Sequence, residues 1–146
     1  MVLEASQELK EVNRLYKELD DIYHDISLRL GISDSVLIIL YSIVEMGDGC
    51  IQKDISEKFS ISRQTINSAI KKLQSQGYIT LKQGKGRDMH IYLTPDGKKY
   101  AEDIVGPVME LENSVFKEMS PEESREFLRL TQKYVSLFQE KVKQIK

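Results

Sequence analysis

The sequence predicts a mainly α-helical protein with a two-stranded β wing: a winged helix-turn-helix flanked by N- and C-terminal dimerisation helices. Three observations predict this fold. Long amphipathic segments lie near both ends of the 146 residues. Two short helical segments with a tight turn between them lie in the middle, and after Gly77 the spacing of apolar residues changes from the helical to the strand period. We assign residues 33–97 to the winged helix-turn-helix domain, and residues 1–32 and 98–146 to the dimerisation helices.

The first two elements are predicted helices. Residues 6–30 have apolar side chains at helical spacing between charged ones, and Gly31 is expected to end this amphipathic helix. Residues 34–46 contain the run VLIILYSIV, which is apolar on nearly all sides and therefore belongs in the middle of the molecule. Ser33 or Asp34 can cap this second helix.

Two short helices follow, at residues 52–59 and 63–76. Ser60 or Ser62 provides the capping hydroxyl of the second one, and Gly77 is expected to end it. This helix has an apolar stripe that consists of Ile66, Ala69, Ile70 and Leu73.

Residues 78–82 and 89–93 alternate between apolar and polar side chains around a connector with two glycines, which predicts a β-hairpin. Two long helices are expected after it, at about 95–118 and 121–144. The second begins with the serine, proline and acidic residues typical of a helix start. The side chains expected to face the core from the hairpin are Ile79, Leu81, Met89, Ile91 and Leu93.

The composition is that of a globular protein, with 40% hydrophobic and 30% charged residues. No window has the run of about 18 apolar residues that a membrane span needs, and the N-terminus is polar and acidic, unlike a secretory signal. The single cysteine, Cys50, excludes an intrachain disulfide framework, so we expect a cytoplasmic protein that does not bind membranes.

The charge is distributed unevenly along the chain. Residues 58–87 contain seven basic residues and no acidic one, whereas the remainder contains 14 basic and 23 acidic residues, a balance of −9. The formal net charge of −2 therefore conceals a local basic block, which favours a surface that binds a polyanion.

The predicted helix 63–76 presents polar side chains opposite its apolar stripe. Steps of 100° per residue place Gln64, Asn67, Ser68 and Lys71 on that side. Amides, hydroxyls and cations are the groups that contact base edges in the major groove. At the hairpin tip, glycines beside Lys85 and Arg87 allow these cations to approach a backbone or a minor groove. The predicted DNA-binding residues are Gln52, Lys53, Ser62, Arg63, Gln64, Thr65, Asn67, Ser68, Lys71, Lys72, Lys85 and Arg87.

The segment SRQTINSAIKKLQSQGYITLKQGKGRDMHIYLTPDGKKYAEDI resembles the DNA-binding region of the MarR family of transcriptional regulators. The long helices on both sides extend the resemblance over nearly the whole chain. It implies a homodimer with interlocked terminal helices, which binds a palindromic operator through a recognition helix in each major groove and Arg87 in the minor groove. It also implies release of DNA when a small phenolic or other ligand binds.

The wing departs from the family pattern at one position. The family usually has an aspartate two residues before the wing arginine, where it supports the arginine side chain, but this sequence has Lys85 there. Either Asp88 supports Arg87 instead, or Arg87 is held less rigidly and the wing binds DNA by general attraction.

The last predicted helix has too many apolar positions for a helix that lies alone on a small domain. We therefore expect an obligate dimer and a pseudo-palindromic DNA site with half-sites about 34 Å apart. These apolar positions are Phe127, Leu128, Leu130, Tyr134, Val135, Leu137, Phe138, Val142 and Ile145.

Three groups of residues are candidates for a sensing or ligand site. Cys50 precedes a predicted helix and lies near Lys53, as a redox-sensing thiolate would, although a half-buried structural cysteine fits better. His24 and His90 lack metal-ligand spacing, so neither a metal nor a cofactor is expected. An aromatic ligand could bind among Tyr16, Tyr23 and Tyr41, but ordinary core and interface packing explains these aromatics better.

The sequence therefore predicts a DNA-binding regulator, more specifically a repressor that a small ligand relieves. No phosphate-binding glycine loop, nucleophile elbow or metal cluster favours an enzyme. Two alternatives stay open, a winged-helix adaptor for protein–protein contact and a redox-sensing regulator that uses Cys50.

Overall fold

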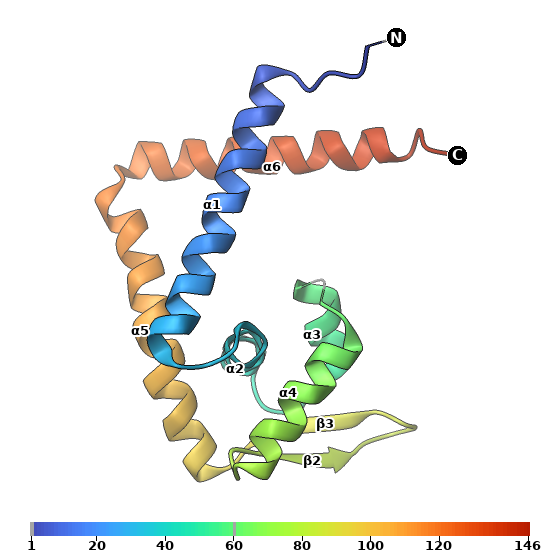
Figure 1. The fold of residues 1–146 in the computed structure, drawn as a ribbon, viewed down its shortest axis with the longest axis vertical. Helices are drawn as coiled ribbons and strands as arrows, with labels where there is room; N and C mark the ends of the chain where they lie inside the picture. The colour runs from blue at the N-terminus through green and yellow to red at the C-terminus, as the bar shows by residue number, and fades with distance from the viewer. Residues whose placement is uncertain (1, 60) are drawn as a thin grey trace. The chain divides into compact units, whose positions relative to one another are not determined.

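The computed structural model describes residues 2–59 and 61–146, which form six helices and one three-stranded sheet (Figure 1). The chain divides into two compact units, the first ending at Val108 and the second beginning at Met109. In chain order the elements are α1 (Gln7–Leu30), α2 (Asp34–Met46), β1 (Cys50–Ile51), α3 (Gln52–Phe59), α4 (Arg63–Ser75), β2 (Ile79–Gln83), β3 (Met89–Leu93), α5 (Pro95–Glu118) and α6 (Pro121–Val142). The mainly α-helical winged fold predicted from the sequence is confirmed.

Capping residues begin α2 and end α4 at the positions that the sequence predicts. The Ser33 hydroxyl caps α2 by accepting a hydrogen bond from the Val36 amide at 3.2 Å. After α4, Gly77 adopts a left-handed conformation with φ 82°. The amides of Gly77 and Tyr78 then donate to the carbonyls of Gln74 and Leu73, each at 3.0 Å. This is the Schellman arrangement, which satisfies the last carbonyls of a helix and requires a residue that tolerates positive φ.

The core of the first unit forms around α2. Ile39 and Leu40 of this helix are completely buried, as are Ile66 and Ile70 of the α4 stripe. The α2 and α4 helices contact one another, so the apolar side of α4 lies against the centre of the unit. Its polar side is consequently left at the surface.

The sheet contains a strand that the sequence analysis missed. β1 pairs with β3 in antiparallel register, Cys50 opposite Ile91, and β3 also pairs with β2, so the strand order is β1-β3-β2. The hairpin prediction is confirmed, with one exception in the core positions. Met89 was expected to face the core, but it is exposed because it lies at the distal end of the hairpin, beyond the pairing with β1.

A close backbone contact connects the hairpin to α5. The Thr94 hydroxyl donates to the Gly77 carbonyl at 2.6 Å and accepts from the Gly97 amide at 3.0 Å, so one side chain joins the end of α4 to the start of α5. A Cβ atom on Gly97 would lie 1.8 Å from the Tyr78 carbonyl oxygen, so only glycine fits there. The Tyr78 and Tyr100 rings stack nearby with centroids 4.1 Å apart.

The second unit contains the end of α5 and all of α6. A capping box begins α6, since the Ser120 hydroxyl accepts from the Glu123 amide and the Glu123 carboxylate accepts from the Ser120 amide. The Phe116 and Phe127 rings meet at a centroid distance of 6.2 Å. No residue of α6 is buried within the chain.

Candidate nucleic-acid interface

Helices α3 and α4 form a helix-turn-helix in which the turn is held by side-chain hydrogen bonds. The Ser56 hydroxyl of α3 donates to the Ile61 carbonyl at 2.9 Å. The Ser62 hydroxyl caps α4 by accepting from the Thr65 amide at 3.2 Å and is also bonded to the Thr65 hydroxyl. Ser62 is thus one of the two predicted caps, and Ser60, the other, lies outside the described residues. The turn positions α4 next to the β2–β3 hairpin in the same unit (Figure 1).

The surface of α4 opposite its buried stripe is polar and contains no acidic residue. Of the residues that the helical spacing places on this side, Gln64, Ser68 and Lys71 are exposed and Asn67 is half-buried. Arg63 and Lys72 are exposed beside them. The first turn also lacks an acidic residue. Among the residues that the structure describes, none of the three cations on this helix forms an ion pair. The amide-rich start of α4 and these free cations together form a surface of positive potential.

Two polar residues of the predicted set are joined to each other. The Gln52 side chain, at the start of α3, donates a hydrogen bond from Nε2 to Oδ1 of Asn67 at 3.3 Å. Both residues are half-buried. Asn67 therefore lies at the boundary between α3 and the open face of α4, with its oxygen engaged by α3.

Two lysines of the region are less available than their sequence positions indicate. The ammonium of Lys58, which belongs to the basic block, lies 2.5 Å from a carboxylate oxygen of Glu45 on α2. Lys53 lies within 3.9 Å of Glu57, one turn further along α3. The acid-free stretch therefore gives an acid-free surface on α4 but not on α3, and in the wing it ends at Asp88, which is exposed next to Arg87.

The wing ends in a tight loop between β2 and β3. The Gly84 amide donates to the Asp88 carbonyl at 3.0 Å, and Gly86 has φ 75°, which explains a glycine there. Lys85 and Arg87 are exposed at this tip. Asp88 does not form an ion pair with Arg87 in the part of the chain that the structure describes, so the alternative that Asp88 supports the arginine is not observed.

His90 fixes the base of this loop, a role that the sequence did not reveal. Its Nδ1 donates to the Gly49 carbonyl at 2.6 Å, and a Cβ atom on Gly84 would lie 2.2 Å from its Nε2. The imidazole therefore fills the space above Gly84 and connects the wing to the turn before β1. On the same face of the hairpin, where Lys82 pairs with His90, the Lys82 ammonium lies 4.9 Å from the centre of the Tyr92 ring.

Cys50 is a buried structural residue, with 8% of its surface exposed. Burial raises the pKa of its thiol above the ordinary value, and the carboxylates of Asp54 and Asp48 act in the same direction. A redox sensor needs an exposed thiolate with a lowered pKa. The environment of Cys50 is the opposite, because the thiol is buried and the nearby charges are carboxylates rather than cations.

The other candidate sites are only partly brought together. Tyr16 and Tyr23 lie exposed on α1, and Tyr41 is half-buried on α2, so the aromatic pocket stays a prediction. Among the described residues no group of three or more potential ligands could hold a metal ion. No single helix in the described part is long and apolar enough to cross a membrane, and only the pair α1 and α2, bent by 94°, passes that test by length and composition.

The comparison with protein families matches residues 30–87 to the model of the MarR family. This segment contains α2, β1, the helix-turn-helix, β2 and the wing tip up to Arg87. No curated protein sequence matches the chain significantly.

Solved structures extend the likeness to the whole fold. A MarR family regulator from Neisseria meningitidis has a TM-score of 0.82 at 20% identity, with 97% of this chain and 100% of that chain covered. A MarR family protein from Listeria monocytogenes, solved with a 26mer DNA, has a TM-score of 0.69 at 22% identity over 92% of this chain and 89% of that chain.

A third structure, Staphylococcus aureus MarR in complex with salicylate and kanamycin, has a TM-score of 0.69 at 18% identity, covering 90% of this chain and 89% of that chain. At these identities the structures establish the fold alone. The family match over residues 30–87 and the fold around it agree with the resemblance drawn from the sequence: residues 30–87 are similar to the MarR family, and the chain has the fold of the solved MarR regulators.

Proposed function

We propose that this protein is a homodimeric transcriptional regulator that binds a pseudo-palindromic DNA site. The observation that carries the proposal is the acid-free polar face of α4 beside the wing, where Arg63, Lys71, Lys72, Lys85 and Arg87 are exposed and form no ion pair with any described residue. Cations on a helix narrow enough for the major groove attract phosphates and donate to base edges. The Listeria protein solved with DNA has the same fold and supports this proposal.

The twelve predicted DNA-binding residues divide by position into three groups. Gln64, Asn67, Ser68 and Lys71 would contact base edges, because they lie along the open side of α4. The start of α4 and the wing tip would contact phosphates or the minor groove, through Ser62, Arg63, Thr65, Lys72, Lys85 and Arg87. Gln52 and Lys53 would lie at the edge of the interface, on α3.

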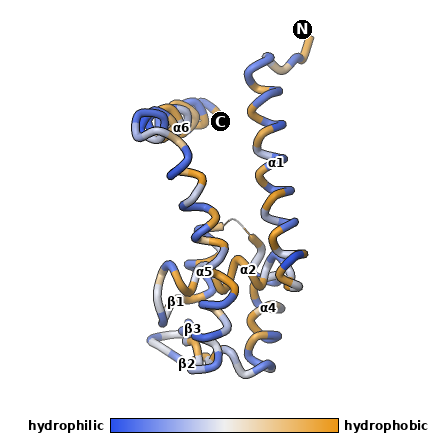
Figure 2. The backbone as a smooth tube through the Cα atoms, turned by 90° about the vertical axis from the view of Figure 1, so that its left-hand side faces the viewer, coloured by the Kyte–Doolittle hydropathy of each residue, from blue (hydrophilic) through white to orange (hydrophobic). Residues whose placement is uncertain are grey.

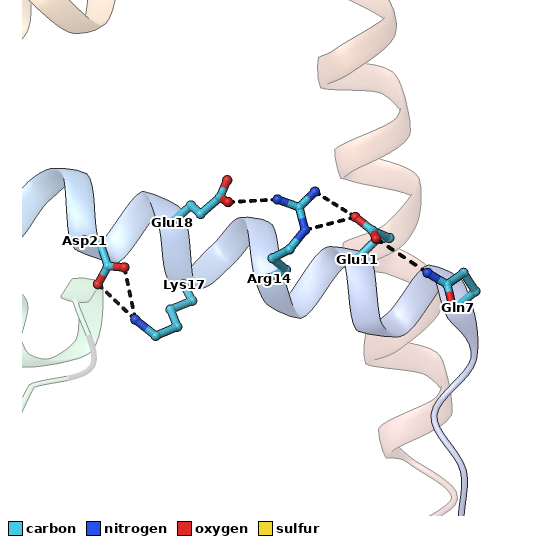
Figure 3. Close-up of polar contacts among 6 residues, drawn as sticks. All are labelled: Gln7, Glu11, Arg14, Lys17, Glu18 and Asp21. Carbon is cyan, nitrogen blue, oxygen red and sulfur yellow. Dashed lines mark hydrogen bonds and ion pairs between the residues drawn. The ribbon is translucent and has the colours of Figure 1, made fainter.

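Dimerisation is supported by apolar faces that the single chain leaves uncovered. On α1 the charged side chains bond to each other, Arg14 to Glu11 and Glu18, and Lys17 to Asp21 (Figure 3). Hydrophobic residues alternate with these along α1, and α6 has a similar pattern (Figure 2). The exposed apolar residues of the two helices include Leu9, Leu15, Leu19 and Ile22 on α1, and Phe127, Leu128, Leu137 and Phe138 on α6. Apolar surface of this extent favours association with a second copy.

In this proposal residues 33–97 bind DNA, and residues 1–32 and 98–146 form the dimer. The compact units divide later, at Val108, because Ala101, Ile104 and Val105 in the first half of α5 are buried within the first unit. We further propose that the protein represses transcription and acts in the cytoplasm. In this proposal a small aromatic ligand that binds near Tyr16, Tyr23 and Tyr41 releases it from DNA. The S. aureus MarR complex with salicylate is an example of a similar fold with a small aromatic ligand.

The test is selection of bound sequences from a random DNA pool, followed by binding measurements across salt concentrations. We expect a site with two-fold symmetry and a steep loss of affinity as salt rises, because cations that neutralise phosphates release counterions. Binding without sequence preference would contradict a regulator. Absence of binding together with retention of a protein partner would favour the adaptor alternative.

A further inference from the structure

The hydrogen bond between Gln52 and Asn67 joins the two helices of the helix-turn-helix at the surface proposed to face DNA. Gln52 is the first residue of α3, and Asn67 is the fifth of α4. Nε2 of Gln52 donates to Oδ1 of Asn67 at 3.3 Å, across 15 residues of sequence. Both side chains are half-buried, so neither amide rotates as freely as one in solvent.

This bond occupies the acceptor of the Asn67 amide and leaves its donor group available. A free asparagine offers one oxygen acceptor and one NH2 group with two donors. Here the oxygen already accepts a proton from α3. Within the described part of the chain Nδ2 has no partner, and because it is attached to the same carbon as Oδ1 it is directed away from Gln52. What Asn67 offers on the open side of α4 is therefore mainly a donor.

Base edges in the major groove differ in what they can take from such a donor. Guanine presents two acceptors, N7 and O6, and thymine presents O4, whereas cytosine presents only an amino donor. Adenine presents one acceptor and one donor and is bound best by an amide whose oxygen is free as well. A donor-only amide thus favours guanine, then thymine, over adenine and cytosine.

We propose that Gln52 is a positioning residue for specificity: it fixes the Asn67 amide so that Nδ2 donates to a guanine or thymine edge at one base pair of each half-site. The inference rests on the proposed DNA-binding function and deepens it. It also changes the role expected for Gln52, whose sequence position indicated a direct DNA contact.

The experiment compares selected DNA sites and affinities for the full-length wild type and for Gln52→Met and Gln52→Glu. Methionine has a similar length and no donor, so it leaves Oδ1 of Asn67 free. The preference for guanine or thymine at this base pair should then fall from about fivefold or more to nearly none, and adenine should become favoured. A carboxylate at position 52 only accepts. It should turn the Asn67 amide over, so that Nδ2 bonds to it and Oδ1 faces the groove, and the preference should move to cytosine or adenine.

Gln74→Glu is the matched control, because it introduces the same charge on an exposed residue of α4 that lies outside the proposed binding set. We expect it to lower affinity at all sites without changing base preference. Asn67→Ala identifies the base pair concerned, and circular dichroism establishes that each variant is folded. If Gln52→Met does not fold, the change of base preference expected for Gln52→Glu still tests the role of Gln52.

The outcomes separate the two levels of the proposal. Wild-type protein without any sequence preference would overturn the proposed function and this inference with it. A sequence-specific wild type whose preference changes in Asn67→Ala, but not in either Gln52 variant, would overturn only the role of Gln52. Loss of the guanine or thymine preference in Gln52→Met, together with reversal to cytosine or adenine in Gln52→Glu, is the result expected.

Discussion

Helices α4 and α6 are both amphipathic, yet they use their two faces in opposite ways. In α4 the apolar residues Ile66, Ile70 and Leu73 are completely buried in the chain's own core, and the polar face is exposed. In α6 no residue is buried, and Phe138 has 56% of its surface exposed. The polar face of α4 is exposed and suits a polar partner such as DNA, whereas the apolar face of α6 is left largely uncovered by the described part of the chain.

The largest effect is expected from a charge on the apolar face of α6. We predict that Phe138→Asp dissociates the dimer and lowers the free energy of unfolding by about 4 kcal/mol or more per dimer, since the substitution occurs twice in a symmetric interface and removes buried aromatic area. Light scattering would measure the assembly, and urea denaturation at several protein concentrations the stability. Ser136→Asp, which adds the same charge on the opposite face of α6, should leave both unchanged. Equal behaviour of the two variants would contradict dimerisation through this face.

A cavity in the apolar stripe of α4 should destabilise the chain without changing its assembly. We expect Leu73→Ala to lower the free energy of unfolding by about 3 kcal/mol, because the completely buried side chain leaves a cavity. Urea denaturation monitored by circular dichroism measures this loss. Thr80→Ala, at an exposed position of β2, is the control and should change stability by less than about 0.5 kcal/mol. A dimer that dissociates in Leu73→Ala before it unfolds would show that α4 also supports the interface.

The helices and their buried and exposed faces could largely be predicted from the sequence, because helix periodicity and capping depend on residues three or four positions apart. The bounds of α2 and α3 agree with the predicted residues 34–46 and 52–59. The prediction of which α4 residues form the buried apolar stripe is also confirmed, since it depends only on the spacing of residues along one helix.

Features that join distant residues could not be predicted in this way. Strand β1 has two residues and forms only because Cys50 and Ile51 meet Ile91 and His90, about forty positions later. The ion pair of Lys58 with Glu45 and the Gln52–Asn67 hydrogen bond likewise depend on how helices pack. The exposure of Met89 follows from how far β1 extends along β3. In each case the sequence pattern predicts the helix or strand, whereas the pairing and burial of the side chain depend on residues that are distant in the sequence.

Substitutions on the polar face of α4 should weaken DNA binding and leave the fold intact. We predict that Arg63→Ala and Lys71→Ala each reduce the free energy of operator binding by about 1–3 kcal/mol, with unchanged thermal stability, because both side chains are exposed and lack an ion-pair partner among the described residues. Fluorescence anisotropy with selected and scrambled DNA measures the effect. A loss on the selected site alone indicates a base contact, and a uniform loss with a smaller salt dependence indicates a phosphate contact. Unchanged affinity in both variants would show that another face binds DNA.

The smallest expected effect concerns the connection of α1, the other helix with an exposed apolar face, to α2. His24 of α1 lies 3.0 Å from the Asp34 carboxylate at the start of α2, and this hydrogen bond lowers the pKa of Asp34 below its ordinary value. A carboxylate whose pKa is lower in the folded than in the unfolded state stabilises the fold above the unfolded-state value, and this contribution is lost as the pH falls through the folded-state pKa. Because both side chains are more than half exposed, we expect Asp34→Asn to cost less than about 1 kcal/mol at neutral pH.

The difference between wild type and Asp34→Asn should therefore narrow as the pH falls below the usual carboxylate range. Urea denaturation of both proteins at a series of pH values measures it. His24→Gln is the matched variant, since it removes the imidazole and leaves the carboxylate at the start of α2, where the helix dipole still favours a negative charge. A stability difference that stays constant with pH would mean that the contribution of Asp34 does not depend on its charge and that α1 is joined to α2 by apolar contacts rather than by the His24–Asp34 pair.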